Sequence, residues 1–161
     1  MGAIQKAAAT AEVATRENRE GVTDLRSAIK ASEAQFALAL PKHVDAGRFM
    51  RCALTAINVV PKLGQCTRDS VLAGLMQAAQ LGLEVADVRG QAYLIPRWDG
   101  RDKCMKAGFQ LGYRGMIDLA ARGGITITVD DICANDQYDF ERGTNAYLRH
   151  KPTLGNRGDV I

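Results

Sequence analysis

Apolar residues recur every three or four positions in the first half of the chain and every second position in its middle. The three-and-four spacing predicts helices that bury one face, and alternation predicts half-buried strands. The clearest helical stripe, between residues 45 and 60, consists of Phe49, Met50, Ala53, Leu54, Ile57 and Val60.

Capping and helix-breaking residues set the ends of three predicted helices. After Gly21 interrupts an alanine-rich start, Thr23 or Asp24 can begin a helix that runs to about Leu40 and stops at Pro41. The second helix begins at Asp45 and ends at Pro61. The third begins at Thr67 and ends at Gly82, which suits a left-handed helix end.

From Gly90 onward the pattern predicts strands. Tyr93, Ile95 and Arg97 share one side of an extended run, and a polar turn near Asp99 leads to a second run ending near Tyr113. A short helix over residues 116–122 follows, then an alternating strand over residues 125–130. Residues 138–141 and 146–150 give a weaker hairpin pattern.

These elements predict an α+β fold, with a helical N-terminal half followed by a small antiparallel sheet with a short helix. The length of 161 residues suits one domain with a real core, and the 47% hydrophobic and 24% charged content is that of a globular protein. The apolar runs are too short for a membrane span, and no signal peptide is visible.

Charge is unevenly distributed along the chain, although the net charge is only +3. Residues 89–122 carry seven basic and three acidic side chains, whereas residues 124–161 carry four basic and six acidic ones. This asymmetry favours a localised site for a polyanion, or else two solvated faces of opposite sign.

The basic middle segment supplies most of the candidate binding residues. Arg97, Arg101, Lys103 and Lys106 cluster around the predicted turn, where they either contact phosphates or are ordinary solvated charges. An exposed Trp98 beside them suggests a partner. The second-tier candidates are Lys42, Lys62, Arg68, Arg89 and Arg122.

Two tyrosines are candidates for stacking on nucleobases. Tyr113 and Arg114 lie where a strand meets a helix N-terminus, a place that favours phosphate. Alternatively, Tyr113 is a core residue and Arg114 pairs with Asp118. Tyr93 is either a stacking platform or part of the sheet packing.

Other chemistry has little support in the sequence. No glycine run has the spacing of an ATP-binding loop, so we expect no ATP and no resident cofactor. The four cysteines are irregularly spaced, which predicts free thiols in a reduced, cytoplasmic setting rather than a zinc site. Neither histidine has a nucleophile at a recognisable spacing. The acidic residues Asp130, Asp131, Asp136 and Asp139 could bind a divalent ion or cap turns.

Several unusual strings occur together and in order: LPKHVDAGRFMRCALTAI, VPKLGQCTRDSVLAGLMQAAQLGLEV, GQAYLIPR and FQLGYRGMIDLAARGG. Together they resemble the RecT family of phage single-strand annealing proteins over residues 36–152, most specifically over residues 63–122. Residues 1–35 are similar only as a generic helical leader.

The resemblance implies a protein that coats single-stranded DNA and anneals it to its complement without ATP, inside a bacterial host cell. It also implies assembly into rings or helical filaments, a phage exonuclease as partner, and a basic groove for DNA across adjacent subunits. We expect residues 1–35 to form an oligomerisation segment and residues 36–161 an annealing core. Since family members continue past the position of Ile161, we expect the C-terminal part of that core to be missing.

The sequence therefore predicts a binder and annealer of single strands, not an enzyme. Two alternatives stay open. One is a metal-dependent nuclease that uses the C-terminal acidic residues, with magnesium as its cofactor. The other is a self-association module without DNA activity.

Overall fold

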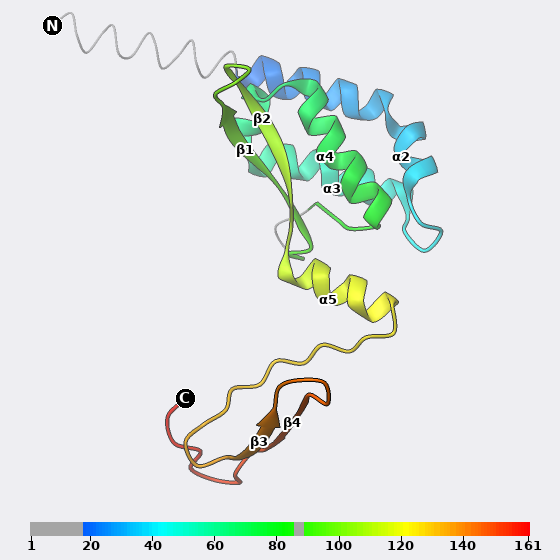
Figure 1. Ribbon diagram of the computed structural model, residues 1–161. Coiled ribbons are helices and arrows are strands. Elements are labelled where there is room, and N and C mark those ends of the chain that lie inside the picture. Colours follow the sequence, from blue (N-terminus) through cyan, green and yellow to red (C-terminus); the bar gives the residue numbers. More distant parts are fainter. Residues whose placement is uncertain (1–17, 86–88) are drawn as a thin grey trace, which may run out of the picture. The chain divides into compact units, whose positions relative to one another are not determined.

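The computed structural model describes residues 18–85 and 89–161, which divide into two compact units. One unit ends at Ile125, and the other comprises Thr126–Ile161. The first contains a helix over residues 18–31, α2 (Glu33–Ala39), α3 (Ala46–Val59), the 3₁₀ helix η1 (Pro61–Gln65), α4 (Arg68–Leu81), β1 (Ala92–Asp99), β2 (Cys104–Leu111) and α5 (Tyr113–Arg122) (Figure 1). The second contains β3 (Gln137–Glu141) and β4 (Tyr147–Lys151). The predicted α+β class is confirmed.

The first described helix corrects the prediction that Gly21 interrupts the chain. Residues 18–31 are helical, so Gly21 and Thr23 lie inside the helix, and the Thr23 hydroxyl donates to the Arg19 carbonyl at 3.0 Å. A β-carbon at Gly21 would lie 2.1 Å from the carbonyl oxygen of Gly64. Glycine is needed there because two backbones approach closely, not because the helix ends. Residues 1–17, where the sequence predicted the rest of a helical leader, lie outside the described residues.

The single helix predicted to run to about Leu40 is divided into two, whereas the ends of the later helices follow the sequence closely. α2 is set off from the preceding helix at Ser32, whose hydroxyl donates to the Ala28 carbonyl and thereby competes with the helical hydrogen bonds. The Asp45 carboxylate accepts from the Arg48 backbone N–H at 2.7 Å and so caps α3. Gly82 ends α4 with a φ of +63°. Between the second and third predicted helices, residues 61–65 form a 3₁₀ turn.

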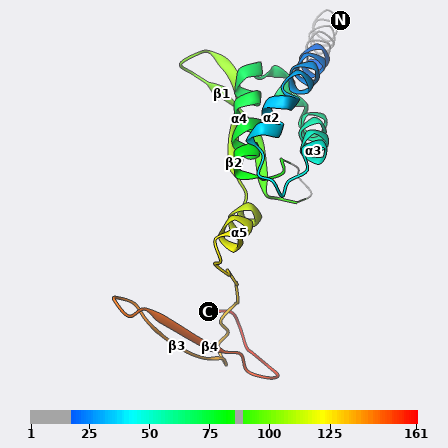
Figure 2. The same cartoon turned by 90° about the vertical axis from the view of Figure 1, so that its right-hand side faces the viewer.

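The core of the first unit lies between its helices and the β1–β2 hairpin, which lies against α4 (Figures 1 and 2). Phe36 of α2 and Phe49 of α3 are buried with ring centroids 5.7 Å apart. Leu25 and Ile29 from the first helix are also buried. That helix therefore stabilises the core, whereas its predicted role in oligomerisation, like the division at residue 35, stays a prediction.

The hairpin is antiparallel, with Ala92 opposite Leu111 and Asp99 opposite Cys104. Four residues connect its strands, in agreement with a turn longer than two residues. The hairpin is held to α4 by the Ser70 hydroxyl, which accepts from the Ala107 N–H at 2.9 Å. α5 begins at Tyr113, three residues before the predicted start, so Tyr113 ends no strand.

The predicted strand over residues 125–130 is absent, and this prediction was wrong. These residues form neither helix nor strand, and Ile127 and Val129 are 44% and 85% exposed. Alternation shows that a segment suits a sheet, but a strand exists only where a second strand accepts its hydrogen bonds. No described residue supplies that second strand.

The second unit is organised around Asp136, whose side chain is fully buried. Its carboxylate accepts from the Arg157 guanidinium at 2.6 Å, from the backbone N–H groups of Cys133 and Thr153, and lies 3.0 Å from Nε2 of His150. Arg157 is the main reason that the pKa of Asp136 lies far below its usual range. The predicted hairpin is confirmed, with Tyr138 opposite His150.

None of the helices in residues 18–85 and 89–161 has the length and apolar character that a bilayer crossing requires. The four cysteines are free thiols, as predicted.

Candidate nucleic-acid interface

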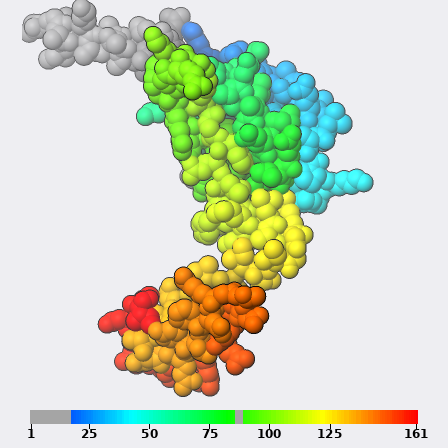
Figure 3. Space-filling model, in the orientation of Figure 1, coloured from blue at the N-terminus to red at the C-terminus, as the bar shows by residue number. Residues whose placement is uncertain are grey.

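One side of the β1–β2 hairpin faces away from the core. Ala92 and Leu94 are buried, whereas the alternate positions Tyr93 and Arg97 are at least partly exposed. Because side chains alternate across a strand, Tyr93 and Arg97 share the outer side, as predicted. In Figure 3 the yellow-green strands form part of the visible surface of the first unit.

Two cationic side chains stand directly opposite each other on this outer side. Arg97 of β1 pairs in register with Lys106 of β2. Arg97 donates to the side-chain oxygen of Gln110 at 3.2 Å. The Lys106 ammonium lies 2.9 Å from the Asp99 carboxylate and also bonds to Asp102, and these two acids raise its pKa.

The turn at the tip of the hairpin presents two cations and an indole to solvent. The Asp99 carboxylate accepts from the backbone N–H groups of Arg101 and Asp102 at 2.9 and 3.3 Å, which fixes the turn. Trp98 is 64% exposed. In the described part of the chain, the side chains of Arg101 and Lys103 form no hydrogen bond or ion pair.

At the other end of the hairpin, α5 opens with a tyrosine and an arginine that contact each other. Tyr113 is 62% exposed, its hydroxyl accepts from Nε of Arg114 at 3.0 Å, and the guanidinium carbon lies 5.7 Å from the ring centroid. The alternative pairing of Arg114 with Asp118 does not form, because Asp118 bonds to Gln91 and Arg122. The tyrosine ring is therefore free for stacking on one face.

Two glycines bring this end of the hairpin together. A β-carbon at Gly112 would lie 2.1 Å from the Gly90 carbonyl oxygen, and one at Gly90 would lie 3.1 Å from the Tyr93 hydroxyl. The Arg114 side chain approaches Gly90 as well. The side chains of Tyr93 and Arg114 therefore both lie beside Gly90, whose backbone carries no side chain.

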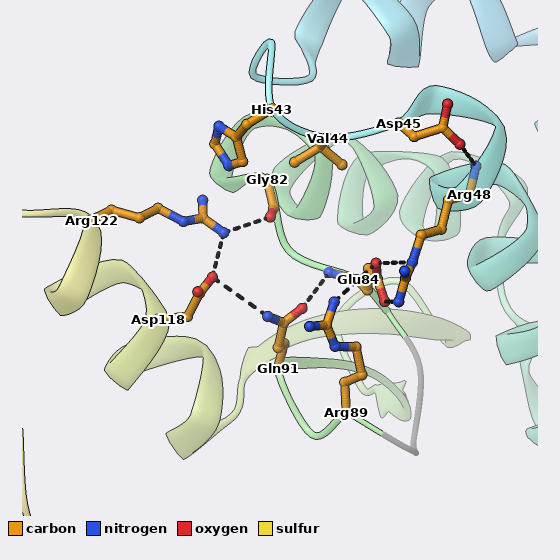
Figure 4. A pocket seen from close by; sticks show the side chains of 10 residues that line it. All are labelled: His43, Val44, Asp45, Arg48, Gly82, Glu84, Arg89, Gln91, Asp118 and Arg122. Carbon is orange, nitrogen blue, oxygen red and sulfur yellow. Dashed lines mark hydrogen bonds and ion pairs between the residues drawn. The ribbon is translucent and has the colours of Figure 1, made fainter.

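Beside this end of the hairpin lies a pocket of about 540 Å³ that contains three arginines (Figure 4). Glu84 is only 6% exposed and forms ion pairs with Arg48 at 2.5 Å and Arg89 at 3.2 Å. The hydrogen bond to Glu84 is the main reason that the pKa of Arg48 is raised. The side chains of Arg48 and Arg89 are each roughly half exposed. Sequence reasoning identified Arg89 but missed Arg48 and Glu84, for which the only signal was an acidic residue inside the apolar string LGLEV.

Arg122, a predicted DNA contact, has a clear structural role in the same pocket. Its guanidinium donates to the carbonyl oxygens of Leu81 and Gly82 at 2.7 and 2.9 Å and pairs with Asp118. These carbonyls lie at the end of α4, where a cation is favourable. Figure 4 shows Arg122 directed at Gly82 and Asp118.

The twelve predicted binding residues do not converge on one point. One group lies at the outer half of the hairpin: Arg97, Trp98, Arg101, Lys103 and Lys106, with Lys62 on the neighbouring η1. The other lies at its base: Arg89, Tyr93, Tyr113, Arg114 and Arg122, with Lys42 beside Pro41, which contacts Gly82. An eight-residue strand is about 26 Å long, so the two groups mark a track rather than a pocket.

Two of the acidic residues that a nuclease would need, Asp136 and Asp139, are bonded to other side chains. Asp136 is held by Arg157, and Asp139 accepts from the Tyr147 hydroxyl at 2.8 Å. Within residues 18–85 and 89–161, no three acidic, histidine or cysteine side chains gather as metal ligands would.

Comparison with known proteins places the chain in a family. The RecT family model matches residues 47–161. Over 122 residues the chain is 42% identical to Protein RecT of Escherichia coli (strain K12), an alignment that covers 73% of this chain and 45% of that protein. The chain belongs to the RecT family. It spans less than half the length of this curated relative.

Proposed function

We propose that this protein binds single-stranded DNA along the outer side of the β1–β2 hairpin and anneals complementary strands without ATP. The observation that carries the proposal is a set of cations on the exposed hairpin that no carboxylate neutralises in the described structure. Arg97 bonds to the neutral amide of Gln110, and the side chains of Arg101 and Lys103 form no ion pair. Family membership supports the same function.

The two groups of residues define complementary tasks. Cations at the tip and on the strands offset phosphate repulsion, and each phosphate they neutralise releases counterion. Tyr113, with Arg114 against its ring, offers a stacking surface at the base. A track of about 26 Å suits a short run of nucleotides. Phosphate contacts and stacking carry no sequence information, so we expect binding to tolerate different sequences.

Annealing on this surface is physical rather than covalent. The strand is held by its backbone, its bases stay available, and a second strand is retained only where enough base pairs form. We propose that several copies act together, as a ring or helical filament, inside a bacterial host cell. A phage exonuclease that supplies the single strand is the partner that this function requires.

A fluorescence assay for annealing of complementary oligonucleotides, run across a salt series, tests the proposal. The variant Arg97→Glu/Arg101→Glu/Lys103→Glu changes three side chains of the outer half but leaves the ion pairs of Lys106 intact. We expect it to lose nearly all binding and annealing at moderate salt, because each lost phosphate contact reduces the salt-dependent affinity.

The matched control is Arg19→Glu/Lys30→Glu/Arg142→Glu, which makes the same change in net charge at exposed positions outside β1, β2 and the turn between them. Circular dichroism verifies that both variants fold. Equal loss in the two variants would show a general charge effect, and unchanged DNA binding in the hairpin variant would leave the self-association alternative as the better explanation.

A further inference from the structure

Arg48 and Arg89 reach the same buried carboxylate from different parts of the chain. Arg48 lies in the first turn of α3, and Arg89 lies shortly before β1 (Figure 4). Nε of Arg48 lies 2.5 Å from Oε1 of Glu84, and Nη1 of Arg89 lies 3.2 Å from the same oxygen. A single buried acid therefore fixes the positions of two guanidinium groups.

The balance of charge in this pocket leaves one positive charge beside Glu84. Two further carboxylates line the pocket, and each already has a cation of its own: Asp45 with Arg51, and Asp118 with Arg122. One cationic partner is enough to compensate a buried carboxylate, so the second arginine on Glu84 is surplus to that need. The opposite balance exists at Lys106, whose single ammonium faces two carboxylates.

Both guanidinium groups keep N–H donors that Glu84 does not use. Arg48 donates to Glu84 from Nε and Nη2, and Arg89 from Nη1. The remaining donors of both groups have no partner within residues 18–85 and 89–161, and they border a pocket of about 540 Å³. Arginine forks that are held in position by other side chains are favoured protein ligands for phosphate.

We propose that Arg48 and Arg89 together bind the terminal phosphate of a DNA strand. This inference rests on the proposed function and adds to it the recognition of strand ends. A terminal monoester has three free oxygens and carries nearly two negative charges, so it can accept from both guanidinium groups at once. An internal diester has fewer free oxygens and a single charge, and the sugars on both of its sides would have to leave the pocket again.

The pocket lies where the proposed DNA track ends. Arg89 is followed directly by Gly90, beside which the side chains of Tyr93 and Arg114 lie. A strand that follows the outer side of the hairpin to its base therefore arrives at Arg89. On the side toward the core the pocket is bounded by Gln91, which is buried. A site that is closed on one side suits the end of a strand better than a strand that passes through.

Anisotropy titrations with one oligonucleotide in three forms test the inference. The forms carry a 5′-phosphate, a 3′-phosphate or hydroxyl groups at both ends, and the fluorophore is attached to an internal base. The measured quantity is the ratio of the affinities of one protein for a phosphate-ended and the hydroxyl-ended form, so a general loss of DNA binding cancels. We expect a ratio of about ten for one of the two ends. Ratios near one for both ends would overturn the inference, whereas binding of the hydroxyl-ended form would still support the proposed function.

Two changes at Arg48 separate a specific site from a general effect of added charge. Arg48→Gln should reduce the ratio to near one, and Arg48→Lys should lose most of it, because lysine keeps the charge but lacks the planar fork. In both variants Arg89 still pairs with Glu84, and circular dichroism verifies folding. Arg51→Gln is the matched control, since Arg51 lies on the same helix, is 73% exposed and should leave the ratio unchanged. An undiminished ratio in both Arg48 variants contradicts the inference.

Inorganic phosphate tests the same site without DNA. In nitrogen-15-labelled protein, the Nε–H resonances of Arg48 and Arg89 should shift as phosphate replaces chloride at constant ionic strength, whereas that of Arg51 should stay in place. Equal shifts for all three arginines, or no shift at Arg48 and Arg89, would count against the site. Because no strand is present, the phosphate site can be confirmed or rejected even if the protein binds no oligonucleotide, an outcome that would contradict the proposed function itself.

Discussion

Arg97 and Lys106 face each other across the β1–β2 ladder, yet only Lys106 is neutralised by carboxylates. Asp99 and Asp102 hold its ammonium, whereas Arg97 bonds only to the neutral amide of Gln110. The positive charge of Arg97 is therefore more available to a phosphate than that of its neighbour. Arg97 and Lys106 are therefore expected to contribute differently to DNA binding, and separate variants can test each contribution.

Replacing Arg97 by Gln should weaken binding to single-stranded oligonucleotides and make it less sensitive to salt. Losing one phosphate contact should reduce the slope of log affinity against log salt by about 0.7. Fluorescence anisotropy over a salt series measures this slope. Arg142→Gln, outside the hairpin, should leave it unchanged, and an unchanged slope for Arg97→Gln would mean that this guanidinium touches no phosphate.

Replacing Asp102 by Asn should change the affinity for DNA in the opposite direction and strengthen binding. The change removes a negative charge from the track and releases one of the two carboxylates on Lys106. Because exposed ion pairs contribute little, we expect a gain of about threefold at low salt that fades as salt rises. The same anisotropy titration measures it, and weaker binding by this variant would show that the pair positions Lys106 for its contact.

Tyr113 offers a direct test of stacking. Tyr113→Ala should cost about 1–3 kcal/mol of affinity for single strands, whereas Tyr113→Phe should retain most of it because the ring stays. The Phe variant also removes the hydroxyl that accepts from Arg114. Equal losses in the two variants would assign the role to that hydrogen bond and not to the ring.

The second unit should open in acid because of Asp136. Its pKa in the folded state lies far below the usual value of about 4, so the stability it contributes is present above that value and is lost as pH falls below it. The protection factors of residues 133–158, which compare observed with intrinsic hydrogen-exchange rates, should fall progressively below about pH 4. Asp136→Asn should exchange rapidly even at neutral pH, since Arg157 loses its carboxylate.

Asp159→Asn is the matched control, because the Asp159 side chain is exposed and forms no hydrogen bond in the described structure. A wild-type unit whose protection factors are the same at about pH 2 as at neutral pH would contradict the role assigned to Asp136.

Gly115 should resist substitution although it lies in a helix. A β-carbon there would lie 2.2 Å from the Gln91 carbonyl oxygen, so α5 would have to move away from the hairpin. We expect Gly115→Ala to lower the free energy of unfolding by about 1–3 kcal/mol, even after the gain of about 1 kcal/mol in helix propensity. Urea unfolding followed by circular dichroism measures it. Gly100→Ala, with open space around the added carbon, should be close to neutral.

Local sequence patterns were sufficient for most elements and for the exposed side of the hairpin that carries the candidate residues. Asp45, Pro41 and Gly82 set helix ends through their own backbone and side-chain chemistry, which acts within a few residues. Alternation alone placed Tyr93 and Arg97 on one side of a strand. These features depend on neighbours in the chain, and the sequence contains them completely.

What the tertiary structure decided depends on residues far apart in the chain. The sequence suggested that Gly21 breaks a helix, whereas the structure shows that its backbone packs closely against Gly64. Arg122 remains a predicted DNA contact, but only the structure shows that it also bonds to the end of α4. The alternation at residues 126–130 indicates a strand, but only a partner can make it one. A single sequence states what each segment can do, whereas packing decides which groups are already bonded, because burial and hydrogen bonding belong to pairs and not to single residues.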